Sequence, residues 1–455
     1  MSVIRWLMLP MLLLPAERVA ACLSDADLEL FGQIAYVRKM PSAWQIDGDN
    51  PYRANNGYND LAVKYSNRCQ LIEDRLSFSV ALYGLAYYPF QTTGAFEKDD
   101  NRMRVLFDRL SLSYNLSDTV RLDAGKIRNK GGLFYLKSPA GLLNNDYAGF
   151  KPTRINHPAM KQAYTESFWG AVLSEDSADR SLSLTVAPKF THIDKRYESS
   201  SNWSALERSN SSDRYLLTYT DYRFDNFTPS ASLMLGDSKS LALANSYNLS
   251  PQLIFNAELA WHMQQQWRHL DRDSAERVQN YAFPEELYRT NDKQGIELAL
   301  GMQYTTDRFS QFGVEYYFQS EGYSAAQWRK QTDLIKFLNQ RTHYAPLDNA
   351  FDAYKYLMAS EIYNTSSKGN LLGRHYLNSY ASILMQDQSS LKPWVVINML
   401  DKSSIVGITY TKPLDKWSKQ LEIYTGVYAA FGNKDSEFGL FGETLGNYLG
   451  FNYHF

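Results

Sequence analysis

Apolar and polar residues alternate one by one over segments of roughly ten residues along most of the chain. The segment 421–431 is an example, and the segments 253–261 and 296–304 repeat its pattern. Its apolar face carries Leu421, Ile423, Val427, Ala429 and Phe431. Because successive side chains of a strand point to opposite sides, each segment predicts a strand with one apolar and one polar face. A soluble β-sandwich would show the same alternation.

The connections between these strands favour a membrane barrel over a sandwich. Short turns alternate with longer polar loops, except that two connections at the long-loop end, near 237–239 and 401–403, are short as well. The short set comprises 115–118, 225–227, 248–251, 305–307 and 386–390, and the longer set 38–60, 89–103, 128–166, 191–213, 262–294, 319–375 and 432–445. Outer-membrane barrels have short periplasmic turns and long extracellular loops. We therefore predict an all-β fold, a transmembrane antiparallel β-barrel of about 16–18 strands.

The first residues have the layout of an export signal. Arg5 precedes an apolar run over 6–14, and small residues occupy 19–21. This pattern predicts a cleaved signal peptide over 1–21 and a single barrel domain over 22–455, while a buried N-terminal helix is the alternative. Cys22 would then be the first mature residue. It is either acylated, as in lipoproteins, or joined to Cys69 in a disulfide that an oxidising periplasm permits.

Composition excludes two other classes of protein. The chain is 44% hydrophobic with a net charge of -2 and a mean hydropathy of -0.43. No segment after the signal approaches the ~20 consecutive apolar residues of a spanning helix. The charge balance lacks the basic excess of a nucleic-acid binder, so we expect no nucleic-acid partner. Tyrosines stand directly before four short turns, which predicts an interfacial girdle unless ordinary strand propensity explains them: Tyr114, Tyr247, Tyr304 and Tyr410.

The end of the sequence is its most specific signal. Gly450, Phe451, Tyr453 and Phe455 combine a glycine, alternating aromatics and a terminal phenylalanine. This segment resembles the closing strand of Gram-negative outer-membrane porins, closely over the last strand and only in pattern elsewhere. In that family it is the assembly signal read by the barrel-insertion machinery. The resemblance implies contact with outer-membrane lipid and lipopolysaccharide, and it leaves a homo-oligomer open.

A barrel of this size is wide enough to hold water, which implies passive passage of small hydrophilic solutes. In porins the loop after the fifth strand folds into the lumen, and here that position falls on 128–166. The loop carries Lys130, Lys137, Lys151, Arg154 and Lys161 against Asp146. Folded inward, they would form a positive constriction that favours anions. Equally, the loop could lie outside and bridge lipopolysaccharide.

Alternation also predicts which charged side chains line the lumen. Glu258, Glu297, Glu315 and Glu422 point inward from the C-terminal side of the barrel, and Arg121 and Asp123 from the N-terminal side. We expect a transverse field between this acidic wall and the basic loop. The resemblance adds a preference for anionic or carboxylate-bearing solutes.

The longest connection, 319–375, has helical character. Ser324 is placed to cap a helix over 325–341, and a second helix is expected over 350–363. Such helices could gate the mouth, cover it as a lid, or form a packed extracellular cap.

Enzymatic and scaffolding functions find less support. The chain has none of the common motifs for metal, nucleophile or phosphate chemistry, and no cofactor is expected. A surface phospholipase could use His262 or His375. A scaffold or an export conduit for a partner would need a docking domain or plug, yet only about five residues separate Cys22 from the first strand.

Overall fold

The computed structural model describes residues 26–44, 56–88, 102–128, 132–145, 154–160, 167–193, 206, 209–265, 267–290, 293–367, 371–440 and 442–455. Eighteen strands of these residues belong to one sheet. They are β1 (Asp27–Lys39), β2 (Gly57–Ile72), β3 (Leu76–Tyr88), β4 (Arg102–Asn115), β5 (Val120–Ile127), β6 (Phe168–Asp176), β7 (Arg180–Ala187), β8 (Arg214–Asp221), β9 (Phe227–Gly236), β10 (Ser240–Asn248), β11 (Leu253–His262), β14 (Gly295–Thr305), β15 (Gln311–Gln319), β16 (His375–Leu384), β17 (Ser390–Asn398), β18 (Ser404–Pro413), β19 (Leu421–Phe431) and β20 (Glu443–His454).

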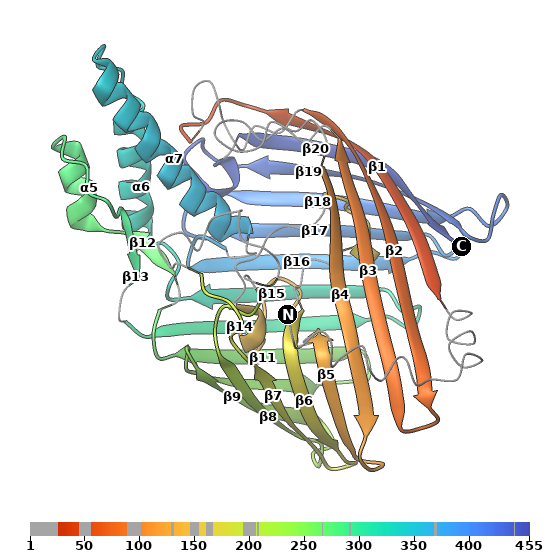
Figure 1. Ribbon diagram of the computed structural model, residues 1–455. Helices are drawn as coiled ribbons and strands as arrows, with labels where there is room; N and C mark the ends of the chain where they lie inside the picture. The colour runs from red at the N-terminus through yellow and green to blue at the C-terminus, as the bar shows by residue number, and fades with distance from the viewer. Residues whose placement is uncertain are drawn as a thin grey trace.

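The sheet closes on itself. Each strand pairs in antiparallel fashion with the next one along the chain, and β20 pairs with β1 from Glu29↔His454 to Lys39↔Glu443. Closure leaves no strand edge, which matters because an unpaired N–H or C=O group is costly in lipid. The predicted antiparallel barrel is confirmed, with a strand number at the upper end of the predicted range. Figure 1 shows the ring of strands from β1 round to β20.

The two ends of the barrel differ as the connection lengths predict. The connections of one end are short, such as 73–75, 116–119 and 306–310. The other end carries the long connections together with the two short ones at 237–239 and 399–403. In Figure 1 the C-terminus lies at the short-turn end, and the helices α5 to α7 stand at the opposite end. We call these the periplasmic and extracellular ends.

The outer wall is apolar over its whole circumference. Leu233 and Leu243 on the paired strands β9 and β10, and Leu449 on β20, are exposed and oriented outward, whereas residues next to them in sequence, such as Ser232 and Ala242, are buried on the inner side. Exposed apolar side chains in a continuous band are the mark of a lipid-facing surface. Tyr114, Tyr247 and Tyr304 are exposed at the periplasmic ends of their strands. Within the described part of the chain, no helix has the length and apolar character needed to cross a membrane.

The extracellular connections build a small helical cap with its own apolar core. It contains α5 (Arg272–Gln279), α6 (Ala325–Leu338), α7 (Ala345–Ser367) and a hairpin of β12 (Arg268–Leu270) and β13 (Tyr288–Thr290). Leu334, Ile335, Phe351, Met358 and Ile362 are buried in this core. Ser324 caps α6 through a reciprocal capping box with Gln327, as the sequence predicts. The helix ends three residues earlier than predicted, α7 is longer, and α5 with its hairpin was not predicted.

Candidate solute pathway and constriction

The connection between β5 and β6 enters the barrel and is held by glutamates of the inner wall. Glu258 on β11 accepts hydrogen bonds from the backbone N–H groups of Leu133, at 2.6 Å, and Ala140, at 2.9 Å. It also accepts one from the Ser138 hydroxyl at 2.7 Å. A carboxylate offers about four lone-pair sites, so one side chain can satisfy several donors of an irregular backbone.

Glu315 on β15 holds the same segment from the next part of the wall. It accepts hydrogen bonds from the N–H groups of Tyr135, at 2.7 Å, and Leu136, at 2.9 Å, while Asn378 donates to it at 2.8 Å. The Tyr135 ring stacks on Tyr380 with centroids 4.9 Å apart. Residues 133–140 therefore lie against the inner wall formed by β11 to β16.

Lys137 and Glu297 form the third contact on this side. Their charged groups are 3.9 Å apart, and both are buried. The Tyr317 hydroxyl donates to Glu297 at 2.8 Å, and the Lys137 ammonium lies 5.8 Å from the centre of the Tyr317 ring. The charge of Lys137 is thus paired within the wall of the barrel.

A second part of the loop, residues 154–160, binds the opposite side of the ring. Arg154 forms a bidentate pair with Asp60 on β2, with 2.9 Å between Nε and Oδ2, and its guanidinium lies 4.2 Å from the centre of the Tyr58 ring. The Gln33 amide donates to the Arg154 carbonyl at 2.9 Å and accepts from the Asn156 N–H at 2.7 Å. Arginine suits this position because its planar fork matches a carboxylate and stacks on aromatic rings.

His157 continues this attachment. Its Nε2 lies 2.6 Å from Glu422 on β19, and its ring contacts Phe31 and Tyr424 with centroids 5.2 and 4.9 Å away. The neighbouring Ile155 and Met160 are fully buried in the same cluster. Sequence reasoning missed Gln33, Asp60 and His157 because only the fold brings these side chains together.

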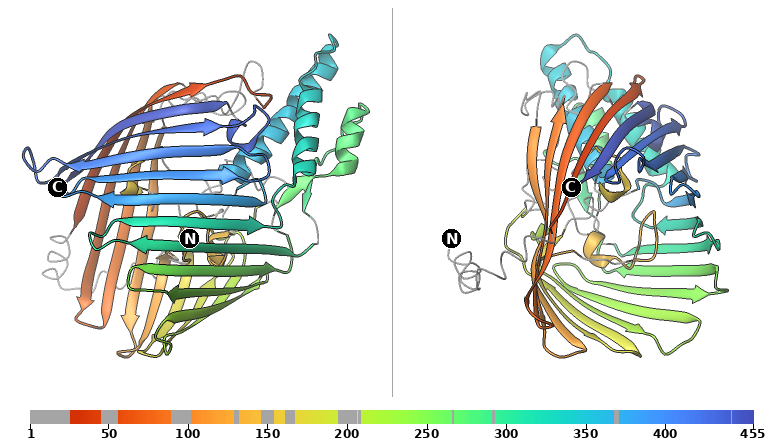
Figure 2. Two further views of the ribbon diagram at one scale, coloured as in Figure 1. Left: turned by 180° about the vertical axis from the view of Figure 1, so that it is seen from behind. Right: turned by 90° about the vertical axis from the view of Figure 1, so that its right-hand side faces the viewer.

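A short helix between the two attached segments fills a third sector. α3 (Leu142–Asn145) buries Leu142 and Leu143 against Phe168, Leu216 and other inward side chains of β6 to β11. Arg214 donates to the Leu143 carbonyl at 3.2 Å. In the right-hand view of Figure 2 this helix lies within the ring of strands. The loop therefore touches the inner wall in three sectors, and Lys130, Lys151 and Lys161 lie outside the described residues.

The expected field between an acidic wall and a separate basic loop needs correction. Glu258 and Glu315 bind backbone N–H groups of the loop, Glu297 pairs with Lys137, and Glu422 binds His157. Wall and loop are in direct contact, so these carboxylates do not face the loop across open water. Side-chain patterns could not reveal this, because the loop offers mainly backbone donors.

The N-terminal wall is more basic than predicted. Arg121 and Asp123 point inward as expected, but they pair with each other at 2.7 Å and share Ser113. The strand register places Arg68 opposite Ser79 and Arg109 opposite Ala81, on the same inward face as Lys64. Arg68 is exposed and Arg109 is half-buried. Both residues sit on predicted strands, and counting alternate positions from Lys64 would have found Arg68.

These observations decide the architecture. A closed ring of 18 antiparallel strands has an apolar outer wall and carries a loop folded against its inner wall. The chain has the fold of an outer-membrane porin.

Known proteins show only distant similarity to this chain. No family model matches the chain, and no curated protein does. The solved structure of Pseudomonas aeruginosa OccK11 (OpdR) is similar with a TM-score of 0.49 and 10% identity, over 94% of this chain and 95% of that one. Acinetobacter baumannii OccAB3 gives a TM-score of 0.49 and 10% identity, over 95% and 99%. With TM-scores below 0.5, these likenesses carry no argument, and the fold rests on the strand pairing described above.

One constellation resembles the parts of a hydrolase. The Ser240 hydroxyl lies 2.8 Å from Nδ1 of His262, and Nε2 of His262 lies 3.4 Å from Glu297. Ser240 and His262 are 3% and 1% exposed, so an ester could not reach the hydroxyl. His375 bonds the Tyr316 hydroxyl instead. The Ser240 group serves packing of the inner wall rather than the surface phospholipase chemistry considered from the sequence.

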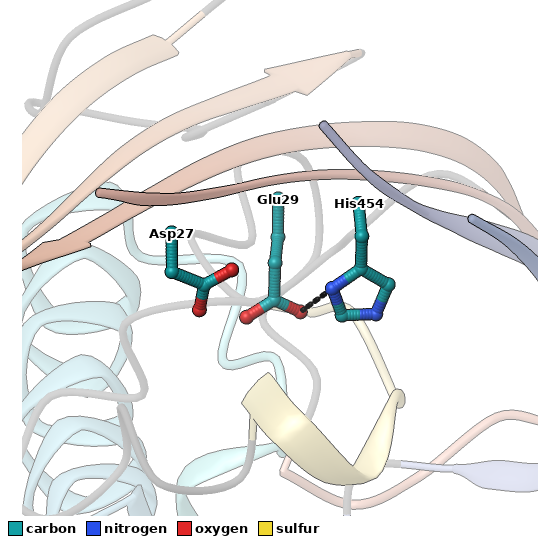
Figure 3. A group of neighbouring side chains, drawn as sticks. All are labelled: Asp27, Glu29 and His454. Carbon is teal, nitrogen blue, oxygen red and sulfur yellow. Dashed lines mark ion pairs between the residues drawn. The ribbon is translucent and has the colours of Figure 1, made fainter. Parts of the chain in front are cut away.

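The seam between the first and last strands carries a charged cluster at the periplasmic end. Figure 3 shows Asp27 and Glu29 of β1 beside His454 of β20. Their donor atoms are those of a metal site, but the Lys64 ammonium already bonds Glu29 and lies 4.0 Å from Asp27. The cluster is therefore accounted for as an ionic link across β2, β1 and β20.

The C-terminal residues and Cys69, which the sequence analysis also singled out, lie at the same end. Phe451 and Tyr453 pair with Gly32 and Leu30 of β1, and their side chains point outward, as does the exposed Phe455. Gly450 lies under the Tyr424 ring on the inner side. Their role as an assembly signal stays a prediction. Cys69 is disulfide-bonded, and Cys22, with the whole expected signal peptide, lies outside the described residues.

Proposed function

We propose that the protein is an outer-membrane channel for the passive diffusion of small hydrophilic solutes, narrowed by the loop 128–166. The observation that carries this proposal is the attachment of the loop to the inner wall by Glu258 and Glu315 on one side and by Asp60 on the other. A loop fixed at both sides of a wide barrel reduces the cross-section without depending on a moving gate. Passive diffusion through such a channel requires no catalytic site.

The distribution of charge supports a preference for anionic solutes. The four wall glutamates are occupied by donors of the loop and by histidine or lysine side chains. Arg68 and Arg109 face the lumen from β2 and β4, and Arg121 does so from β5. Arg121 is paired with Asp123, whereas no ion pair of Arg68 or Arg109 is found among the described residues. Positive charge that no carboxylate neutralises raises the local concentration of anions.

Planar-bilayer recording of the refolded protein under a salt gradient tests both parts of the proposal. Discrete conductance steps support a water-filled channel, and the sign of the reversal potential reports ion preference. A folded, heat-modifiable barrel without conductance would contradict the channel function. Conductance with a cation preference would contradict only the proposed selectivity.

A further inference from the structure

The lipid-facing wall carries an apolar hollow that a transport function does not explain. It has a volume of about 650 Å³ and crosses the outer surface of β14 to β19. Its lining is almost entirely apolar. Phe312 and Val314 of β15, Ser379 and Ala381 of β16, and Val427 of β19 are among the side chains that line it.

Local sequence explains why the wall is hollow here. The outward positions at the centre of the hollow carry small or compact residues, namely Ser379, Ala381 and Pro393. The larger side chains of Met302 and Phe312 protrude farther from the wall at one side. Pro393 also lacks an N–H group, and the β16–β17 pairing skips from Tyr380↔Trp394 to Ile383↔Leu391 at this point. The large rings of this row, Tyr380 and Trp394, are turned inward and leave the outer side open.

The two ends of the hollow lie at different depths in the membrane. From β14 to β19 the hollow spans five interstrand steps, or about 24 Å at ~4.8 Å per step, and Leu253 of β11 also lines it beside Tyr304. At its first end, Tyr304 and Phe312 flank the periplasmic turn 306–310, and at its other end it stops within β19 beside Val427. Only the end at Tyr304 and Phe312 reaches a membrane interface. A molecule lying in the hollow therefore has its polar part at the periplasmic side.

The periplasmic interface at this end of the hollow carries a positive charge that can bind a phosphate group. Arg308 in the turn 306–310 is exposed, and no ion pair of Arg308 is found in the described part of the chain. Lys412, which lies farther along the same rim, is already paired with Asp387 at 3.2 Å. A phosphate group at Arg308 would gain a charge-assisted contact close to the headgroup region.

We propose that this hollow is a binding site for a glycerophospholipid of the periplasmic leaflet. One acyl chain lies along the row from Phe312 to Val427, and the phosphate meets Arg308. A flexible chain can fill a long shallow depression and gain dispersion contacts along it. A second copy of the barrel fits less well, because a two-fold contact would set one concave patch against another. Lipopolysaccharide would need the hollow to open at the extracellular end.

Retention of lipid by the purified full-length barrel tests the proposal. The protein is washed in mild detergent, checked for heat-modifiable folding, and analysed by native mass spectrometry with added phosphatidylglycerol. We expect wild type to keep about one phospholipid per barrel, since the hollow removes several methylenes of an acyl chain from contact with detergent. Ala381→Phe fills the hollow from a lipid-facing position and should weaken retention about tenfold. Ser379→Leu is the smaller change in the same direction.

Matched controls separate this site from general contact with lipid. Ala231→Phe places the same bulk on the outward face of β9 and should leave retention unchanged. Arg308→Gln should weaken retention about threefold, whereas Arg75→Gln in the β2–β3 turn should not. Retention that is equal in wild type, A381F and S379L would overturn the proposal. So would a retained lipopolysaccharide, or a dimer that A381F dissociates. Conductance is recorded separately, so failure here does not touch the proposed channel.

Discussion

The Ser138 hydroxyl of the constriction loop lies 2.7 Å from the Glu258 carboxylate of β11, and the same carboxylate accepts the N–H groups of Leu133 and Ala140. One wall residue thus holds both sides of a bend in the loop. Replacing three such hydrogen bonds with water is possible only if the loop moves away from the wall. In the proposed channel, the width therefore depends on the charge and length of the Glu258 side chain.

Glu258→Ala should release the bend of the loop. We expect the barrel to lose about 1–3 kcal/mol of stability, because buried donors lose their acceptor. Single-channel conductance should rise and become noisier as the loop leaves its wall position. Glu285→Ala, on the exposed cap, is the matched control and should change neither quantity. Unchanged conductance in a folded Glu258→Ala barrel would show that this contact does not set the width.

The pair between Asp60 and Arg154 should show strong coupling. In Asp60→Asn the guanidinium keeps its contact with the Tyr58 ring but loses the bidentate pair, and in Arg154→Gln the carboxylate remains buried without its partner. We expect the double variant to be less destabilised than the sum of the single variants, by about 2 kcal/mol. Unfolding by urea in detergent measures this cycle. Additive effects would mean that the two side chains act independently.

The extracellular cap should loosen as pH rises. Glu437, in the short helix η4 (Glu437–Gly439), accepts hydrogen bonds from the Leu372 N–H at 2.7 Å and from Asn398 at 2.8 Å. Burial raises the pKa of Glu437 to about 7, above its ordinary 4.5. A raised pKa in the folded state gives stability that is fully present below pH 4.5 and is lost as pH rises through about 7. Asp401, which accepts the Glu437 N–H at 2.7 Å, adds to this trend by repulsion.

Hydrogen exchange of residues 371–376, corrected for intrinsic rates, measures this effect at about pH 5 and about pH 8. We expect faster exchange at the higher pH in wild type. Glu437→Gln keeps the shape of the side chain but cannot ionise, so its exchange should stay near the slow limit at both values. Glu285→Gln serves as the control. If Glu437→Gln kept the full pH dependence of wild type, another titratable group would be responsible for that dependence.

Lys64 should stabilise the seam of the barrel. Its ammonium bonds Glu29, which is 3% exposed, so Lys64→Met leaves a buried carboxylate without its cation. We expect a loss of about 2 kcal/mol, measured as a lower temperature for heat-modified migration in gels. Glu29→Gln in the same chain removes the unpaired charge and should restore part of the loss. If Glu29→Gln restored no stability to the Lys64→Met variant, Lys64 would act through packing of its aliphatic side chain and not through its charge.

The strands could be predicted from the sequence because their signal is local. Alternation over 421–431 fixes both the strand and its lipid-facing side, and Ser324 fixes the start of α6. For the constriction loop, the sequence predicts only its position along the chain and not its contacts with the wall. Glu258 and Glu315 lie on the inner wall, and their partners are backbone N–H groups more than a hundred residues away in the sequence. Those contacts depend on the closed ring and leave no trace in side-chain pattern.

The hollow on the outer wall escaped prediction for a related reason. Each of its small residues, such as Ala381 or Ser379, is ordinary within its own strand. Their effect appears only when the register lines them up across β16 to β19. A concave surface is a property of neighbouring strands, whereas periodicity describes one strand at a time.

The arginines of the N-terminal wall should determine ion preference. Arg68 and Arg109 face the lumen on adjacent parts of β2 and β4, separated by β3, and Arg68 is exposed to the channel. Replacing Arg68 by Glu reverses a charge that repels cations, and so does the change at Arg109. In a tenfold salt gradient, the reversal potential of Arg68→Glu/Arg109→Glu should move toward the cation-selective sign, with the larger shift at low ionic strength because salt screens the field. Arg223→Glu, at an exposed periplasmic turn, reverses one charge outside the lumen and should leave the potential where it is, as judged against the single variant Arg68→Glu, which changes the charge by the same amount. An equal shift in that control would show that the overall charge of the mouth determines selectivity. No shift in the double variant would show that the loop, and not these two arginines, determines selectivity.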